Sequence, residues 1–310
     1  MIIVLDDYID ILVFDFNFNR KLYIFSDGLK ELSLLSDNYN CETTQFPDCI
    51  EKISFGNNFN KKINYFSKSL KKLCFGNNFN QNFNECELPD SIEILKFGLF
   101  NQFINKYPKN LIYLKFEDTY TKSIKNVTKT LTKLEISKVD FDEIKNLNCL
   151  KYLENVCRKY NEYEYNDSLI DVESLKSLET LDIKTYPINF KFPNSMKYLT
   201  VDYGNYNTNK NFKKQIRNNF SKFLKKITIL NNSQLCYNHL KFDNLPNLLE
   251  DLSIQSKPIQ KYLPSSLISY TNNNFCHNQA NSDYNKKRNM PNSVKFLFMQ
   301  KIEFINTCND

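Results

Sequence analysis

The sequence contains no tryptophan, a single alanine (Ala280), five glycines and two histidines among 310 residues. Alanine is the best helix former, so its near absence argues against an alanine-rich helical bundle. The five glycines lie at least twenty residues apart, which excludes the glycine-rich phosphate loops of the Walker and dinucleotide-binding types. The commonest nucleotide-binding sites are therefore absent from the sequence.

Long apolar runs are also lacking. No stretch approaches the ~18 to 20 apolar residues that a membrane-spanning helix needs. The beginning, Met1 to Asp7, has no basic region and meets two acids after five residues, so it does not resemble a secretory signal. We expect no membrane segment and an intracellular location.

Nine cysteines are present, but their odd number and irregular spacing, without any C-x-x-C pair, indicate neither a disulfide framework nor a zinc site. We expect free, reduced and mostly buried thiols, and no metal or cofactor. The only histidines, His239 and His277, are near no recognisable nucleophile motif, and the carboxylates show no revealing pairing. The sequence therefore predicts no catalytic residue and a protein that is not an enzyme. The cysteines are Cys41, Cys49, Cys74, Cys86, Cys149, Cys157, Cys236, Cys276 and Cys308.

The residues that are abundant occur in a repeat. The 26 phenylalanines, 19 tyrosines and 45 asparagines give a hydrophobic content of 41% with 25% charge, which is enough apolar material for folding. The segment from Ile50 to Asn60 (IEKISFGNNFN) returns twenty residues later as Leu70 to Asn80 (LKKLCFGNNFN). Looser copies begin at Ile9 and Ile92. The pattern that persists is Φ-x-x-Φ-x-Φ, where Φ is apolar, and further copies begin at Leu29, Leu111, Leu131, Leu178, Met196, Leu224, Leu249, Leu267 and Val294.

The spacing of the last two apolar positions in this pattern is two residues, which is the period of a strand and not of a helix. A strand of about five residues cannot bury its apolar side alone, so successive units must stack at about 4.8 Å and share one core. A unit of about twenty residues is too short for a full return helix. We predict a mainly β solenoid similar to leucine-rich repeats, with one short parallel strand per repeat and irregular or 3-10 return loops.

Proline turns precede many of these strands, as in Leu88-Pro89-Asp90-Ser91-Ile92, and proline suits a turn that ends the preceding segment. The motif asparagines suit the turn after the strand, and stacked copies predict a ladder that satisfies loop amides. The motif phenylalanines are predicted to fill the core between turns. The residues assigned a structural role in the repeat are Leu12, Phe14, Phe18, Asn19, Ile53, Phe55, Gly56, Phe59, Asn60, Leu73, Phe75, Gly76, Phe79, Asn80, Leu95, Phe97, Gly98, Phe100 and Asn101.

These motifs resemble the FNIP repeat, a short relative of the leucine-rich repeat found in amoebae and their giant DNA viruses. The resemblance rests on FGNNFNKKI (55–63), FGNNFNQNF (75–83), FGLFNQFI (97–104) and the looser FDFNFNRKL (14–22). The proline-isoleucine ending of the family name is missing. The resemblance implies a scaffold for protein interaction in the cytoplasm of a host cell, with a host protein as partner. Several members of the family carry an F-box before the repeats; here the first repeat begins at Ile9, so we expect no F-box and no ubiquitin-ligase link.

The repeats predict four segments: regular repeats over 1–145, a degenerate repeat with an insertion over 146–171, diverged repeats over 172–299, and a tail over 300–310. A second break, 272–289, contains a short basic run, Lys286 to Arg288, which is read as a solvated loop. One array with an interruption is thus favoured over two unrelated domains.

The second, third and fifth positions of each unit should face away from the core, and their charges alternate in sign between repeats. A surface that binds phosphates needs aligned lysine and arginine, so nucleic acid is disfavoured as a partner. The function predicted is a non-catalytic scaffold for protein interaction; the alternatives are a nucleic-acid-binding solenoid or a vestigial repeat protein without a ligand. The repeat predicts neither the identity of the partner nor an oligomeric state. The displayed residues include Lys30, Glu31, Ser33, Glu51, Lys52, Ser54, Lys71, Lys72, Cys74, Thr132, Lys133, Glu135, Glu179, Thr180, Asp182, Lys225, Lys226, Thr228, Glu250, Asp251 and Ser253.

Overall fold

The chain forms two compact units, Met1–Arg158 and Lys159–Asp310. The boundary lies within 146–171, the segment predicted as a degenerate repeat. The computed structural model describes residues 8–14, 17–22, 27–42, 46–117, 119–137, 139–155, 169–184, 189–202, 220–230, 245–254, 263–272, 291 and 293–299. Outside these ranges lie His239, His277, Cys157, Cys236, Cys276, Cys308, the basic run Lys286 to Arg288 and the tail 300–310.

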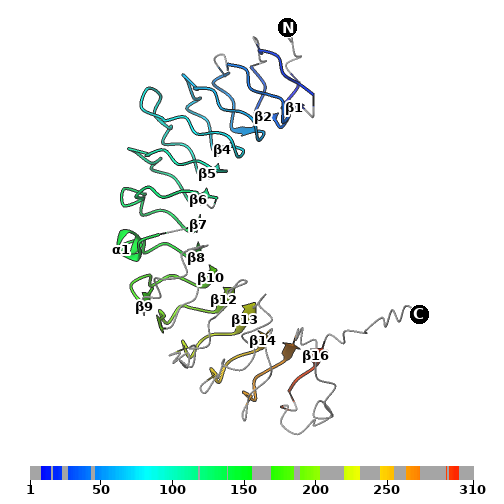
Figure 1. Ribbon diagram of the computed structural model, residues 1–310, viewed down its shortest axis with the longest axis vertical. Helices are drawn as coiled ribbons and strands as arrows, with labels where there is room; N and C mark the ends of the chain where they lie inside the picture. Colours follow the sequence, from blue (N-terminus) through cyan, green and yellow to red (C-terminus); the bar gives the residue numbers. More distant parts are fainter. Residues whose placement is uncertain are drawn as a thin grey trace, which may run out of the picture. The chain divides into compact units, whose positions relative to one another are not determined.

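The first unit is a stack of short parallel strands in chain order. Figure 1 shows the strands along one side of this unit and the return segments along the other. The predicted solenoid with one short parallel strand per repeat is therefore confirmed. The strands are β1 (Ile11–Phe14), β2 (Glu31–Leu34), β3 (Lys52–Phe55), β4 (Lys72–Cys74), β5 (Ile94–Phe97), β6 (Tyr113–Phe116), β7 (Lys133–Ile136) and β8 (Tyr152–Asn155).

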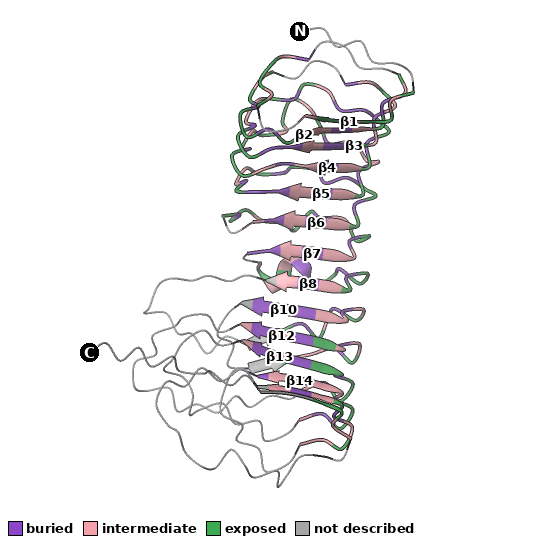
Figure 2. Ribbon diagram, turned by 90° about the vertical axis from the view of Figure 1, so that its right-hand side faces the viewer, coloured by how far each residue is buried: buried purple, intermediate pink, exposed green. Residues whose placement is uncertain are grey.

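The strands pair in a register that aligns equivalent positions of the repeat. Leu73 on β4 lies opposite Ile53 on β3 and Leu95 on β5, and all three side chains are fully buried. Buried and partly exposed residues alternate along β2 to β7 (Figure 2). A shift of the register by one residue would bring the whole apolar set of a strand to the surface. Because burying each such side chain contributes roughly 1.5–3 kcal/mol, the observed register is strongly favoured.

The proline turn before a strand is fixed by two hydrogen bonds. The Ile92 N–H donates to the carbonyl of Pro89 at 3.2 Å, which closes the turn. The Ser91 hydroxyl donates to the carbonyl of Leu70 in the preceding repeat at 2.8 Å. At the equivalent position Cys49 places its Sγ 3.1 Å from the carbonyl of Leu29. The motif thus joins each strand entry to the previous repeat.

The return segments of the first unit are irregular apart from one short helix, α1 (Phe141–Ile144). Asp140 caps it by accepting a hydrogen bond from the Asp142 N–H at 2.9 Å. The sequence analysis did not predict this helix. No 3-10 helix occurs within the described return segments, although single turns there close with a hydrogen bond between residues i and i+3, as from the Val127 N–H to the carbonyl of Ile124. The connections are therefore mainly irregular.

The second unit repeats the same architecture, and β10, β12 and β13 are one residue longer than the longest strands of the first unit. Its parallel sheet follows the order β10, β12, β13, β14, β15, β16, and β9 pairs with β11 in a separate two-stranded sheet that the sequence did not predict. The weak copy at Leu267 forms a strand of the main sheet, with Tyr270 buried in place of an aliphatic residue. The bounds are β9 Leu169–Asp171, β10 Thr180–Lys184, β11 Asn189–Lys191, β12 Tyr198–Asp202, β13 Lys226–Leu230, β14 Asp251–Ile254, β15 Ser269–Asn272 and β16 Phe296–Met299.

Two columns of stacked aromatic rings run through the core of the first unit. In the strand-end column, neighbouring rings such as Phe75 and Phe97 have centroids 5.4 Å apart. In the loop column, Phe59 and Phe79 lie 6.0 Å apart with an interplanar angle of 1°. The columns also contact each other, as at Phe75 and Phe79, 3.8 Å apart. The strand-end column is Phe55, Phe75, Phe97 and Phe116; the loop column is Phe18, Tyr39, Phe59, Phe79, Phe100 and Tyr120.

An asparagine ladder follows the loop column. The Asn80 N–H donates to the Oδ1 of Asn60 at 3.0 Å, and the Asn101 N–H donates to the Oδ1 of Asn80 at 2.9 Å. The ladder extends upstream to Asn40 and Asn19. Each side chain satisfies a loop amide of the next repeat, which would otherwise lack a protein partner.

The glycine after the strand allows adjacent repeats to approach closely. A Cβ added to Gly76 would lie 2.4 Å from the carbonyl oxygen of Gly56 in the preceding repeat. Because the clash is with backbone, no rotamer change relieves it. A side chain here would push two repeats apart and weaken both aromatic columns.

We predict that Phe79→Ala lowers the free energy of unfolding by about 3–5 kcal/mol, because it removes a buried ring from the middle of the loop column. Phe103→Ala is the matched control: its ring is 44% exposed, and we expect a cost below about 1 kcal/mol. Urea unfolding monitored by circular dichroism measures both. Equal losses would show that ring stacking inside the core does not hold the repeats together.

We predict that Asn60→Ala costs about 1 kcal/mol, because the Asn80 N–H loses its side-chain acceptor. Asn60→Asp keeps an oxygen in the same place and should retain most of the stability at neutral pH. Thermal unfolding midpoints of the two variants make the comparison. A larger loss for Asp than for Ala would contradict the ladder.

Candidate functional site

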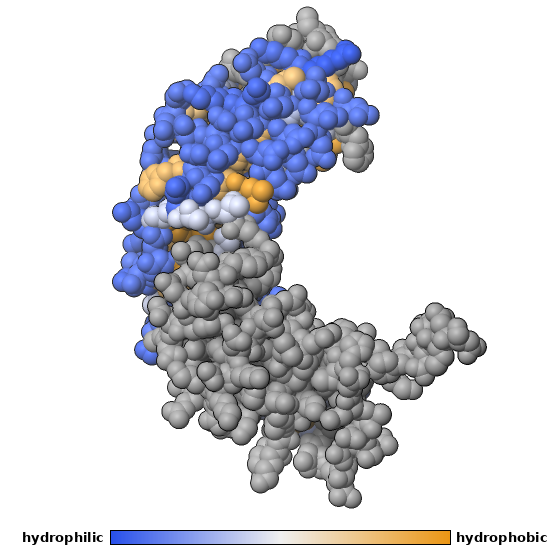
Figure 3. All heavy atoms as spheres, in the orientation of Figure 1, coloured by the Kyte–Doolittle hydropathy of each residue, from blue (hydrophilic) through white to orange (hydrophobic). Residues whose placement is uncertain are grey.

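The side of the sheet that faces away from the core presents side chains from every repeat of the first unit. We call it the strand face, and it comprises the partly exposed residues of β2 to β8 and the residue before each strand. Polar and charged side chains dominate it. Figure 3 shows the flank of the same unit, where hydrophobic side chains form only small areas among the described residues. Its members are Lys30, Glu31, Ser33, Glu51, Lys52, Ser54, Lys71, Lys72, Cys74, Glu93, Ile94, Lys96, Ile112, Tyr113, Lys115, Thr132, Lys133, Glu135, Lys151, Tyr152 and Glu154.

Ion pairs between neighbouring repeats cross this face. Lys71 lies 2.9 Å from Glu51, and Lys52 pairs with Glu31 on the adjacent strand. All four side chains are partly or largely exposed, so each pair contributes at most about 1 kcal/mol. Their effect is to fix the positions of long side chains and to leave this part of the face nearly neutral.

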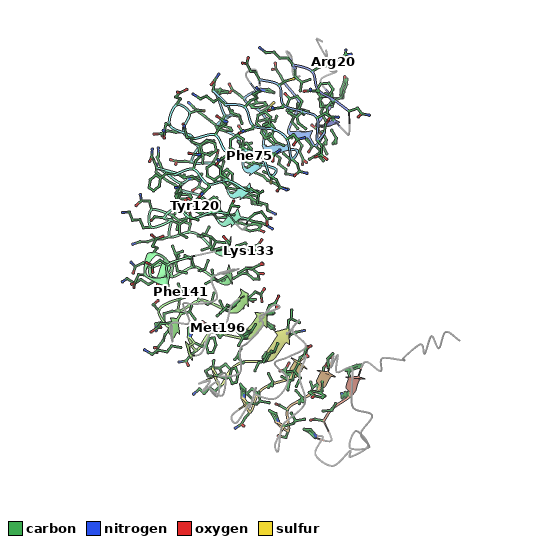
Figure 4. All side chains as sticks on the ribbon, in the orientation of Figure 1. Arg20, Phe75, Tyr120, Lys133, Phe141 and Met196 are labelled. Carbon is green, nitrogen blue, oxygen red and sulfur yellow. The ribbon has the colours of Figure 1, made fainter. Side chains whose placement is uncertain are left out.

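A more buried cluster forms around Tyr113 on β6. Its hydroxyl donates to Glu135 on β7 at 2.7 Å, and Glu135 also accepts from Lys133 at 2.8 Å and lies 3.3 Å from Lys115. Lys96 and Lys133 both place their Nζ 4.6 Å from the centre of the Tyr113 ring. Lys133 also lies 4.4 Å from the ring of Tyr152 on β8. The cluster thus joins four consecutive strands, and Figure 4 shows Lys133 on the strand side, opposite Phe141.

The charge of Glu135 is fixed by this cluster. Burial alone would raise the pKa of its carboxyl, but the hydrogen bonds from Lys133 and Tyr113 and the charges of Lys133 and Lys115 outweigh it. The pKa therefore lies below its ordinary value. The pKa of the Tyr113 hydroxyl is raised, first by burial and then by its bond to Glu135. At neutral pH the cluster holds a carboxylate and a neutral phenol.

Three thiols of the first unit, those of Cys49, Cys74 and Cys86, are poorly suited to act as nucleophiles. Cys74 lies on the strand face, and burial raises the pKa of its thiol. Burial also raises the pKa of Cys49 and of Cys86. A thiol whose pKa is raised holds little thiolate at neutral pH, and the thiolate is the reactive form. The five described cysteines are free.

The second unit also carries ion pairs on its strands. Lys197 lies 3.0 Å from Glu179, and Lys225 lies 3.1 Å from Glu250. Lys226 lies 2.9 Å from Asp251. Its pairs, like those of the first unit, join neighbouring repeats.

The sequence-predicted repeat residues lie in the core and the turns and not on the strand face. Leu12 and Phe14 are half-buried, because β1 has a strand neighbour on one side only, and Phe18 lies beside Phe14 at 4.1 Å. Gly56 and Gly98, like Gly76, abut the backbone of the preceding repeat. The buried apolar members are Ile53, Phe55, Phe59, Leu73, Phe75, Phe79, Leu95, Phe97 and Phe100; Asn19, Asn60, Asn80 and Asn101 form the ladder.

The sequence did not predict two features of the loop column and the strand face. Tyr39 and Tyr120 belong to the loop column, although they stand where other repeats have phenylalanine. Their place was visible in Asn38-Tyr39-Asn40, which aligns with the Asn-Phe-Asn of later copies. The Tyr113 and Tyr152 cluster has no local signal in the sequence, because its side chains come from different repeats and meet only across the strands.

The comparisons with known proteins agree with this geometry. Residues 59–100 match the family model described as FNIP Repeat. This part of the chain carries the FNIP repeat. The matched residues include Phe59, Phe79 and Phe100 of the loop column, so the FNIP motif corresponds to the stacked rings and the asparagine ladder. No curated protein sequence matches the chain.

Two solved structures are similar in fold. One is described as the crystal structure of CroV588, a novel circular LRR protein, with 22% identity and a TM-score of 0.57 over 97% of this chain and 55% of that one. This chain thus spans about half of its length. The other is YopM from Yersinia enterocolitica WA-314, with 15% identity and a TM-score of 0.42 over 89% of this chain and 66% of that one. The first likeness shows that the FNIP repeats form a leucine-rich-repeat type of solenoid.

The described part of the chain contains neither a membrane-spanning helix nor a metal-binding cluster. No helix there is long and apolar enough to cross a membrane. Within the same residues, no group of three or more His, Cys, Asp or Glu side chains is placed to hold a metal ion.

We predict that Glu135→Gln destabilises the protein more at neutral than at acidic pH. The lowered pKa of Glu135 means that its contribution is complete above the ordinary glutamate pKa of about 4.3 and is lost as the pH falls through its own lower value. Urea unfolding of both proteins at pH 7 and pH 3 measures the difference. Glu85→Gln is the control, since its side chain is 71% exposed and pairs only with Lys62. A Glu135→Gln effect that does not change with pH would contradict this electrostatic account.

Proposed function

We propose that the chain is a non-catalytic scaffold that binds a protein partner through the strand face. The observation that supports this most directly is the Tyr113 cluster, in which two tyrosines are held by lysines and a buried carboxylate on adjacent strands. Tyrosine supplies large contact area with few rotatable bonds and is enriched at the energetic centres of protein interfaces. A rigid ribbon that presents such side chains in fixed positions suits a protein partner.

The charge pattern favours a protein over a nucleic acid. Lysines on the strand face alternate with acids, as in the pairs of Lys71 with Glu51 and Lys52 with Glu31. A phosphate backbone requires several free cations in line, and each lysine that is already paired releases no counterion from the nucleic acid. Alternating charges instead provide the complementarity by which protein interfaces select their partners.

The proposal that the protein is not an enzyme rests on the chemistry of the strand face. Glu135 is held ionised by three neighbours, and burial raises the pKa of Cys74. A general acid or a nucleophile at neutral pH needs the opposite shifts. These side chains are suited to fixed contacts and not to proton or group transfer.

The place of action that we propose is the cytoplasm of a host cell, with a host protein as partner. The FNIP motif resembles repeats of amoebae and their viruses, and the free thiols of Cys41, Cys49 and Cys149 fit a reducing compartment. We also propose that residues 1–145 and 172–299 are regular and diverged copies of one repeat, interrupted at 146–171. The equal register of Leu199 with Ile227 and of Ile227 with Leu252 supports this reading of the second stretch.

A capture experiment tests the function. Tagged protein is incubated with nuclease-treated lysate of amoebal cells, cross-linked, and the captured proteins are quantified by mass spectrometry. We expect the Tyr113→Ser/Tyr152→Ser variant to retain about a tenth or less of the wild-type partner, because two interface tyrosines are lost. The control is Tyr65→Ser on the return side, which should bind as the wild type does. Enrichment of RNA without protein from untreated lysate would overturn the proposal.

A further inference from the structure

Two lysines within the strands of the strand face form no ion pair in the described part of the sheet. Among the lysines within β2 to β8, which are Lys52, Lys72, Lys96, Lys115 and Lys133, the first and the last two form ion pairs with glutamates. Lys72 on β4 and Lys96 on β5 form no such pair, and the Nζ of Lys96 lies over the ring of Tyr113. Their positive charges are therefore available to a ligand.

Lys72 and Lys96 lie around the same point of the face. Both charges act on the Cys74 thiol and oppose the rise in its pKa that burial causes. Between the two lysines the face carries Cys74, which lies opposite Lys96, and Ile94, which lies opposite Lys72. The small Cys74 side chain leaves room for a ligand to approach the sheet beside both lysines.

Three carboxylates around this point form ion pairs. Glu31 on β2 pairs with Lys52, Glu51 pairs with Lys71, and Glu135 on β7 is shared by Lys115 and Lys133. Glu93, just before β5, forms no ion pair within the described part of this sheet, and its charge acts on Lys71. The two free lysines thus form a short positive spot between neutralised pairs, which matches a ligand with about two negative charges and not a long polyanion.

The register sets the distance between the two lysines. Lys72 lies opposite Ile94, so Lys96 is one strand across and two residues further along. With strands about 4.8 Å apart and about 3.3 Å per residue, their Cα atoms are about 8 Å apart. In an extended peptide, side chains at i and i+2 point to the same face about 6.6 Å apart. An acid-x-acid sequence therefore places its two carboxylates within reach of both lysines.

We propose that Lys72 and Lys96 bind an acid-x-acid segment of the protein partner, in extended form, with one carboxylate on each lysine. The segment lies over Cys74 and Ile94, and the ring of Tyr113 lies beside Ile94. This inference rests on the proposed function, since it assigns a chemistry to the partner at that same face.

Direct binding of a defined probe tests it. The probe is a fluorescein-labelled twelve-residue peptide with two Glu-x-Glu sequences, and its match has Gln in place of each Glu; a labelled twenty-nucleotide poly-U RNA is the third probe. Fluorescence anisotropy in 50 mM salt should show the Glu peptide binding about tenfold or more tightly than the Gln peptide. Lys72→Gln/Lys96→Gln should remove that preference. Lys122→Gln/Lys125→Gln, which makes the same change of charge on an exposed return loop, should leave it intact.

The outcomes separate this inference from the function on which it rests. Equal binding of the Glu and Gln peptides, or equal loss with both double variants, overturns the acid-x-acid assignment. If Lys72→Gln/Lys96→Gln captures the same lysate protein as well as the wild type does, the scaffold function stands and the assignment fails. If the RNA probe binds more tightly than the Glu peptide and no lysate protein is captured, both fail. Circular dichroism and the thermal midpoint verify that each variant is folded.

Discussion

The parallel pairing of each strand with its neighbour is the constraint on which this structure depends. A strand of three to five residues has no partner for its amides within its own repeat and cannot cover its apolar side. The neighbouring repeat supplies both at once, because Leu73 stands between Ile53 and Leu95 in an unshifted register. Stability is thus a property of pairs of repeats, and a single repeat has none of its own.

This pairing explains why so many contacts occur between identical residues. Rings stack on rings in the loop column, and asparagine oxygens accept from asparagine amides one repeat away. Where the residue type changes, the contact is kept by a side chain of similar shape, as when Tyr39 replaces phenylalanine or Cys49 replaces serine. Side chains on the strand face do not have to match those of the neighbouring repeat in shape. Its residues therefore differ between repeats and can be specific to a partner.

The sequence predicted the solenoid because the period of the apolar residues carries the register, and burial of Ile53, Leu73 and Leu95 follows from it. It did not predict α1 or the β9 and β11 pair, since these lie on the return side, where short irregular segments have no period. The sequence did not predict the cluster at Tyr113 either. It depends on which side chains meet across strands of four different repeats, and no local pattern in any one repeat contains that information.

The hydrogen bonds that join one repeat to the next have a consequence for how such a chain changes over generations. Ser91 donates to a carbonyl of the main chain, and Asn60 accepts from a main-chain amide. Contacts of this kind set no condition on the side chains of the neighbour. A whole repeat can therefore be duplicated or lost by unequal recombination without a compensating mutation elsewhere. The shared FGNNFN of two adjacent repeats is what a duplication of this kind leaves behind.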